Sequence, residues 1–174
     1  MILCFGEALL RFAPSTEGKW IENSSMPTYI GGAELNVAFA LAKWNEKVKY
    51  LTALPDTYLS DEIITYLQSH GIDTSCIIKS TGRMGNYVLP MGEDFKNKGV
   101  IYDRNDSAFS LLKLEQIDLD QLFKDISWFH VSAICPALNR NIANISLILL
   151  KEAKKRNIPT SIDFNYRNKL WQYD

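Results

Sequence analysis

Short apolar segments that alternate with amphipathic helical segments limit the fold of this chain more than any other feature of its sequence. The apolar segments, which we predict to be buried strands, are 2–5, 48–54, 76–78, 127–133 and 158–164. Apolar residues at helical spacing predict helices after Gly31–Gly32, over 59–69, and after Asn139, which can cap a helix N-terminus. Pro55 is expected to end the second strand, and Gly71 to follow the second helix. Strands that alternate with helices favour the α/β class, with a parallel sheet flanked by helices.

Two polar and aromatic segments, 13–30 and 86–104, do not fit this alternation. The first mixes Pro, Ser, Gly and Asn with Trp20 and Tyr29, which is typical of a surface strand or hairpin. The second contains two extended runs on either side of the polar loop 92–98, which predicts a hairpin. We expect the two segments to pair as a small separate sheet over one end of the core.

Charge and composition exclude several classes of protein. Lys and Arg number 19 against 20 Asp and Glu, giving a net charge of −1, and no basic stripe for nucleic acid is visible. No apolar run approaches the ~20 residues that span a bilayer, and Glu7 and Arg11 interrupt the apolar N-terminus. Cys4, Cys76 and Cys135 form no CxxC pair, so we expect core thiols in a reducing compartment. The sequence therefore predicts a cytoplasmic protein that binds neither nucleic acid nor membrane.

Most motifs for catalysis or metal binding are absent from the sequence. It has no GxSxG, HExxH, EF-hand loop, Walker A motif or strand-following GxGxxG, and we expect no metal site. His70 precedes the glycine expected to end a helix, so we expect it to be solvated. His130 lies in a predicted strand, where a hydrogen-bonded core residue is a simpler interpretation than a ligand.

The pair Gly31–Gly32, directly before a predicted helix, is the sharpest candidate for a binding site. Paired glycines let a ligand approach the backbone closely, and free amides at a helix start bind hydroxyl or anionic groups. Asn36 lies one helical turn after Gly32, so its side-chain amide can face the same ligand. A helix-entry turn with a surface Asn is the alternative, and the spacing alone favours it.

Polar residues at two strand ends are further candidates. Tyr102 and Arg104 are predicted on one strand face, and an aromatic ring beside a guanidinium suits a sugar or a carboxylate. An exposed polar strand face is an equal alternative. Asp163, Asn165 and Arg167 alternate directly after the last buried strand, where parallel sheets bind polar ligands, although a loop charge network would give the same pattern.

Three segments resemble the signatures of the ribokinase-like (PfkB) sugar kinases. The segment GGAELNVA (31–38) resembles their first signature, and Glu34 brings it closer to 2-keto-3-deoxygluconate kinases than to fructokinases, which more often carry GGAP. The segment SAICPAL (132–138) resembles their SGITPAL stretch, and DFNYRNKLW (163–171) matches their D-x-N-x-R-x-x-L-W pattern. Order and spacing also agree, and the resemblance covers all 174 residues.

The resemblance implies a ribokinase-like, Rossmann-type parallel sheet with flanking helices, and a small β-sheet lid formed by 13–30 and 86–104. In that family the lid covers the sugar and often makes the homodimer contact. Carried over by position, the substrate-binding residues would be Gly32, Asn36, Tyr87, Tyr102, Arg104, Ile134 and Arg167. Arg167 would lie between the substrate and the ATP phosphates, and Asn165 would also be on the nucleotide side. Ala133 replaces the usual Gly and Asp103 a usual aromatic residue, which changes the shape of the pocket.

One family motif is missing. These kinases keep their catalytic Asp in a GAGD motif at a helix N-terminus in the C-terminal half, and no GAGD occurs here. There the helix amides stabilise the transferring phosphoryl group and the Asp accepts the proton of the substrate hydroxyl. We therefore expect residues 1–174 to be the N-terminal part of one domain, inactive alone, with the catalytic Asp beyond Asp174.

The resemblance implies that the full-length protein uses ATP and Mg²⁺ to phosphorylate a sugar acid, 2-keto-3-deoxygluconate. Fructokinase or another PfkB sugar kinase is the alternative. Arg104 discriminates between the two, because a keto-acid needs a cation for its carboxylate and a neutral ketose does not. A half-protein that binds sugar or a partner without catalysis is a second alternative.

Overall fold

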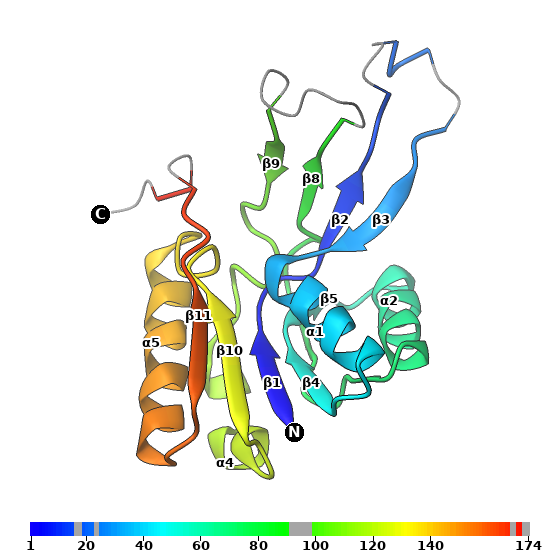
Figure 1. Cartoon of the computed structure of the whole chain (residues 1–174). Helices are drawn as coiled ribbons and strands as arrows, with labels where there is room; N and C mark the ends of the chain where they lie inside the picture. Colours follow the sequence, from blue (N-terminus) through cyan, green and yellow to red (C-terminus); the bar gives the residue numbers. More distant parts are fainter. Residues whose placement is uncertain (16–18, 23–24, 91–98, 168–169, 172–174) are drawn as a thin grey trace.

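A five-stranded parallel sheet forms the centre of the molecule in a computed structural model, which describes residues 1–15, 19–22, 25–90, 99–167 and 170–171. All four neighbouring strand pairs in this sheet are parallel, which confirms the α/β class (Figure 1). In sheet order the strands are β11 (Thr160–Asp163), β10 (Trp128–Ser132), β1 (Ile2–Phe5), β4 (Val48–Leu51) and β6 (Ile72–Asp73).

Helices cover both faces of the sheet because the side chains of its central strand alternate between them. From β1, Leu3 and Phe5 join a core with the inward residues of α5 (Arg140–Lys155), whereas Cys4 joins a separate core on the other face. That second core contains buried residues of α1 (Ala33–Lys43) and α2 (Tyr58–Ser69). The described residues also form two shorter helices, η1 (Leu114–Gln116) and α4 (Leu119–Phe123).

A second sheet of four strands rises from the end of the molecule to which the central strands point (Figure 1). Its order is β3 (Thr28–Gly31), β2 (Leu9–Phe12), β8 (Asn86–Val88) and β9 (Ile101–Asp103). We call it the small sheet. It contains the predicted hairpin, since β8 and β9 are antiparallel, while the predicted loop 92–98 lies outside the described residues.

The two faces of the small sheet carry different side chains. Cross-strand pairing puts Arg11 opposite both Tyr29 and Tyr87, and Tyr87 opposite Tyr102, so these four side chains share one face. Neighbouring positions point the other way, because side chains alternate along a strand. The opposite face therefore includes Leu10, Ile30 and Thr28, and we call it the reverse face.

Several predicted boundaries were wrong. The predicted strand 48–54 is two strands, β4 and β5 (Ala53–Pro55), and Pro55 belongs to β5 instead of ending the run. Proline is tolerated there because β5 pairs only with β7 (Ile78–Ser80) in a two-stranded sheet. The predicted strand 76–78 lies slightly too early, and the two-residue β6 was missed because so short a strand has no periodic pattern.

Strand β2 was missed for a different reason. Its residues Leu9–Phe12 continue the apolar N-terminal run, so hydropathy alone does not separate them from β1. The small sheet thus begins before residue 13, where the polar segment from which it was predicted starts. The helical turns η1 and α4 lie in a region to which the sequence analysis assigned no element.

The predicted environments of the cysteines and of His130 agree with the structure, except that Cys76 is only partly in the core. Cys4 and Cys135 are buried, Cys76 is half-buried, and all three thiols are free. His130 is buried, and its Nδ1 hydrogen-bonds to the hydroxyl of Ser161, as expected for a core histidine. Among the described residues, no helix has the length and apolar character needed to cross a membrane.

Asn139 provides the first test of the fold. Its side-chain oxygen accepts a hydrogen bond from the Ile142 amide at 2.9 Å and caps α5, and its Nδ2 donates to the Ser110 carbonyl at 3.0 Å. We expect Asn139→Ala to lower the free energy of unfolding by about 1–2 kcal/mol, measured by urea denaturation. Asn144→Ala, at an exposed position of the same helix, is the control and should cause no loss. Equal losses in both variants would contradict the cap.

Candidate functional site

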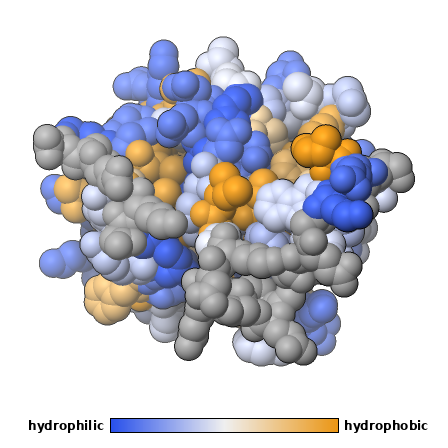
Figure 2. Space-filling model, turned by 90° about the horizontal axis from the view of Figure 1, so that it is seen from above, coloured by the Kyte–Doolittle hydropathy of each residue, from blue (hydrophilic) through white to orange (hydrophobic). Residues whose placement is uncertain are grey.

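The topology of the large sheet points to one place for a ligand. From β1 the sheet continues through β4 and β6 on one side, and through β10 and β11 on the other. The carboxyl ends of β1 and β10 therefore flank a topological switch point, where open α/β sheets bind their ligands. Figure 2 looks onto this end of the molecule, where apolar patches lie between hydrophilic side chains.

A buried ion pair lies at the end of β1. Glu7, two residues after the strand, accepts a hydrogen bond from Nε of Arg104 at 2.6 Å. Both side chains are almost inaccessible, with 2 % of Glu7 and 4 % of Arg104 exposed. Burial alone would lower the pKa of Arg104, but the surrounding acidic groups, Glu7 foremost among them, together outweigh it and raise that pKa, so the guanidinium is charged. Glu7 Oε1 and Arg104 Nη1 have no hydrogen-bond partner among the described residues.

Glycines make room for this pair. A Cβ atom on Gly85, just before β8, would lie 2.4 Å from Glu7 Oε1. A Cβ on Gly32 would lie 2.4 Å from the backbone oxygen of Glu7, and Gly32 has a φ of 147°, which side-chain-bearing residues rarely adopt. The end of β1, the start of α1 and the approach to β8 therefore meet closely. A larger residue at position 32 would collide with backbone, and one at position 85 would displace the Glu7 side chain.

Tyrosines of the small sheet lie next to this junction. The hydroxyl of Tyr87 lies against Gly31, where a Cβ would be 2.7 Å away. The Tyr87 and Tyr102 rings are neighbours, with centroids 6.3 Å apart. Burial raises the pKa of Tyr87, although the nearby Arg11 opposes this, so its hydroxyl keeps its proton and can donate a hydrogen bond.

A second buried carboxylate connects α1 to the end of β10. Glu34 Oε1 accepts hydrogen bonds from the Ser132 amide at 3.1 Å, from the Ser132 hydroxyl, and from the Cys135 thiol at 3.1 Å. The Ser132 hydroxyl also accepts a hydrogen bond from the Ile134 amide at 3.4 Å, so Glu34 holds the segment that includes Ile134. Burial raises the pKa of Glu34, and the hydrogen bonds from Ser132 and Cys135 only partly oppose this.

The predicted site residues fall into two groups. Gly32 and Arg104 contact Glu7, and Ile134 lies on the segment that Glu34 holds. Tyr87 lies against Gly31, next to Gly32, with Tyr102 beside Tyr87. Asn36, Asn165 and Arg167 have no such contact among the described residues. The Asn36 side chain is exposed on α1, and Asn165 follows β11. The exposed Arg167 donates a hydrogen bond to the backbone oxygen of Tyr166.

The predicted position of Arg104 was wrong, and Glu7 is a site residue that the sequence analysis did not predict. Arg104 was expected on a strand face shared with Tyr102, yet β9 ends at Asp103 and Arg104 turns inward to Glu7. Asp103 pairs on the surface with Arg83. Sequence reasoning missed Glu7 as a site residue, although a carboxylate directly after a buried strand was the signal that could have found it.

The described residues contain no group of three or more His, Cys, Asp or Glu side chains that could hold a metal ion. The site instead combines tyrosine and serine hydroxyl groups with the Arg104 guanidinium and the buried carboxylates of Glu7 and Glu34. Such groups bind hydroxylated or carboxylated small molecules by hydrogen bonds.

Comparisons with known proteins agree with this description. The model of the family "pfkB family carbohydrate kinase" matches residues 1–174. A 2-dehydro-3-deoxygalactonokinase of Haloferax volcanii is 33 % identical, over 98 % of this chain and 53 % of its own length. The crystal structure of a 2-dehydro-3-deoxygluconokinase from Thermotoga maritima is 34 % identical with a TM-score of 0.90, covering 98 % of this chain and 52 % of that one.

A probable fructokinase-5 of Arabidopsis thaliana is also similar, at 28 % identity over 98 % of this chain and 52 % of its own length. The chain thus spans about half the length of these relatives.

The raised pKa of Glu34 predicts a particular pH dependence of stability. A carboxyl group with a higher pKa in the folded than in the unfolded state binds more protons when folded, so stability falls as pH rises above its ordinary value of 4.5. Glu34→Gln removes this titration. The unfolding free energy of the variant, relative to the unmodified chain, should therefore rise with pH from about 4.5 upward in urea denaturation. Glu46→Gln, at an exposed position, controls for the change in charge; a difference independent of pH would refute the assignment.

The Glu7–Arg104 pair predicts a large and specific loss of stability. Glu7→Gln leaves a buried guanidinium without its counter-charge and should lower the unfolding free energy by about 3–5 kcal/mol. Asp103→Asn breaks the exposed pair with Arg83 and should cost less than about 1 kcal/mol. Glu7→Leu combined with Arg104→Met, which removes both charges, should recover much of the loss. If the two single variants lose the same amount, the buried pair has no special role.

Proposed function

The chain belongs to the pfkB family of carbohydrate kinases, and from this we propose that the full-length protein transfers a phosphoryl group from ATP to the sugar acid 2-keto-3-deoxygluconate. Residues 1–174 supply the sugar side of the site in this proposal. The group that accepts the proton of the substrate hydroxyl lies outside them, since no GAGD motif occurs in this sequence. The chain alone is then expected to bind the sugar acid without phosphorylating it.

The observation that carries the proposal is the unpartnered Nη1 of Arg104. A buried donor without a partner costs about 1–3 kcal/mol, which a carboxylate oxygen bound there would recover. Glu7 keeps the guanidinium charged and holds its Nε, so the orientation of Nη1 is fixed before the ligand arrives. A sugar acid brings such a carboxylate and a neutral ketose does not.

The remaining residues have roles suited to a polyhydroxylated ligand. We propose that Gly32 and Asn36 bind sugar hydroxyls, that Tyr87 and Tyr102 contact the sugar from the small sheet, and that Ile134 lines the pocket. The Tyr87 hydroxyl retains its proton and so can act as a donor.

The nucleotide side of the proposal rests on fewer residues. Arg167 would lie between the substrate and the ATP phosphates, with Asn165 near it. Because the Arg167 side chain is exposed, its guanidinium is accessible to a phosphate group. The described residues do not form a carboxylate cage for Mg²⁺. In the proposal Mg²⁺ therefore accompanies the ATP phosphates, as is usual for this ion.

Fructose phosphorylation is the second candidate. It is favoured by the 28 % identity to the probable fructokinase of Arabidopsis thaliana, whose named substrate is a neutral ketose. The two are separated by assaying the full-length protein with ATP on 2-keto-3-deoxygluconate and on fructose. A higher kcat/KM for the sugar acid is expected, and a higher value for fructose would replace the first candidate by the second. Sugar binding without phosphoryl transfer by the full-length protein would favour the non-catalytic alternative.

We also propose a cytoplasmic homodimer in which two copies associate through the small sheet. Exposed apolar side chains on its strands, such as Ile101 and Tyr29, are consistent with a contact there. Sedimentation equilibrium tests the oligomeric state, and a monomer at all concentrations would refute it.

Arg104→Lys tests the substrate class directly. Lysine keeps the charge opposite Glu7 but has no second nitrogen to offer a carboxylate. We expect about tenfold weaker binding of 2-keto-3-deoxygluconate, because one charge-assisted hydrogen bond is lost, and little change in the binding of fructose. Calorimetry measures both affinities. Urea denaturation of the same variant shows whether the ion pair survives. Equal losses for both sugars in a stable variant would contradict the role of Arg104 in binding a carboxylate.

A further inference from the structure

A cavity of about 970 Å³ lies between the reverse face of the small sheet and helices α1 and α2. Its lining includes Leu10 and Ile30 of the small sheet and Leu59 and Ile63 of α2. The volume lies within the ~300–1,000 Å³ of cavities that bind small organic molecules. The lining is mostly apolar, so the cavity suits a ligand with a hydrophobic body.

Three rings form one end of the cavity. Phe39 of α1 and His70, which follows α2, meet edge to face, with centroids 5.3 Å apart and planes at 88°. The Tyr66 ring lies 4.3 Å from His70 and 6.0 Å from Phe39. His70 Nδ1 is hydrogen-bonded to the backbone oxygen of Tyr66 at 2.8 Å, which fixes the ring in this cluster. Such a wall favours another planar ring, because aromatic groups pack edge to face or offset at these distances.

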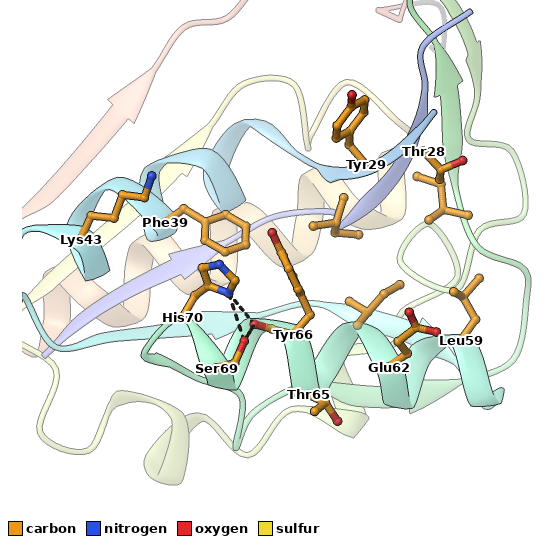
Figure 3. Close-up of a pocket in the computed structure, with 13 residues that line it drawn as sticks. Thr28, Tyr29, Phe39, Lys43, Leu59, Glu62, Thr65, Tyr66, Ser69 and His70 are labelled. Carbon is orange, nitrogen blue, oxygen red and sulfur yellow. Dashed lines mark hydrogen bonds between the residues drawn. The ribbon is translucent and has the colours of Figure 1, made fainter. Parts of the chain in front are cut away.

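Charged side chains are divided between the two ends of the cavity. Lys43 lies beside Phe39 at the end with the rings, and Glu62 lies beside Leu59 at the other end (Figure 3). Neither is in an ion pair with another described residue. A ligand whose ring packs on the three-ring wall therefore lies next to the ammonium group of Lys43, and Glu62, the one carboxylate among the described lining residues, is at the far end.

We propose that this cavity is a binding site for a planar aromatic acid, with its ring against Phe39, Tyr66 and His70 and its acidic group beside Lys43. The site is distinct from the proposed sugar site, because neither Tyr87 nor Tyr102 is among the described lining residues. Leu10 and Ile30 line it from the reverse face of the small sheet, and Tyr29 is the one lining residue that belongs to the face of Tyr87 and Tyr102. Its ligand would touch both the small sheet and the helices.

The test uses 8-anilinonaphthalene-1-sulfonate, a fluorescent aromatic anion, with the neutral N-phenyl-1-naphthylamine as its uncharged counterpart. We expect saturable binding of one anion per chain. Tyr66→Ala should weaken both probes about threefold or more through loss of a ring contact. Tyr58→Ala, on the same helix but 87 % exposed and outside the cavity, should change neither.

Charge variants test the position of the acidic group. Lys43→Gln should weaken the anion about two- to fivefold and leave the neutral probe unchanged, as expected for an ion pair near the surface. Glu62→Gln should not weaken the anion, and Lys151→Gln on the exposed surface of α5 should have no effect.

Three results would overturn the proposal. One is the absence of saturable binding of the anion. The second is binding that Tyr66→Ala and Tyr58→Ala affect equally, which would mean that the probe binds elsewhere. The third is a dimer that Tyr66→Ala dissociates while the probes fail to bind, which would assign the cavity to contact between two copies of the chain. None of these readouts depends on kinase activity, so the test of this proposal is independent of the proposed function.

Discussion

The salt bridge between Glu7 and Arg104 is the interaction on which the arrangement of the two sheets depends. Glu7 lies two residues after the central strand of the large sheet, and Arg104 follows the last strand of the small sheet, 97 residues later. Removing two charges from water costs several kcal/mol, and only close contact with good geometry offsets that cost. A shift of the small sheet would separate the charges while leaving them buried. The ion pair therefore favours one orientation of the small sheet over slightly shifted orientations. The glycines at positions 32 and 85 are small enough to permit the close contact at the pair.

The second buried carboxylate, Glu34, has a different role at the same switch point. Glu7 faces a guanidinium, whereas Glu34 faces the neutral donors of Ser132 and Cys135, so burial dominates and raises its pKa. Protonation costs Glu34 little, because its hydrogen bonds from Ser132 and Cys135 can persist with a neutral carboxyl group. Glu7 without its charge would leave Arg104 uncompensated. One carboxylate fixes the small sheet through charge, and the other fixes α1 against β10 through hydrogen bonds that need no charge.

The sequence predicted the parts of the structure that short-range patterns control. The alternation of strands and helices, the Asn139 cap and the position of Gly71 after α2 all follow from neighbouring residues. The two-residue β6 has no period, and β2 cannot be separated by hydropathy from the strand before it. The pairing of Glu7 with Arg104 has no local signature at all, because two distant segments bring the charges together. Strand alternation marked Arg104 beside Tyr102 without showing that it faces a carboxylate of its own chain.

Strand β3 connects the two sites proposed for this molecule. Its Ile30 faces the cavity, and its last residue, Gly31, lies against the hydroxyl of Tyr87 and leads through Gly32 into α1. Helix α1 in turn carries Asn36 near its start and Phe39 and Lys43 nearer its end, so both sites share the same strand and the same helix. A ligand that alters the position of the small sheet from one face must alter the geometry on the other. By thermodynamic linkage the effect is reciprocal: whatever factor an aromatic acid applies to sugar affinity, the sugar applies to the affinity for that acid.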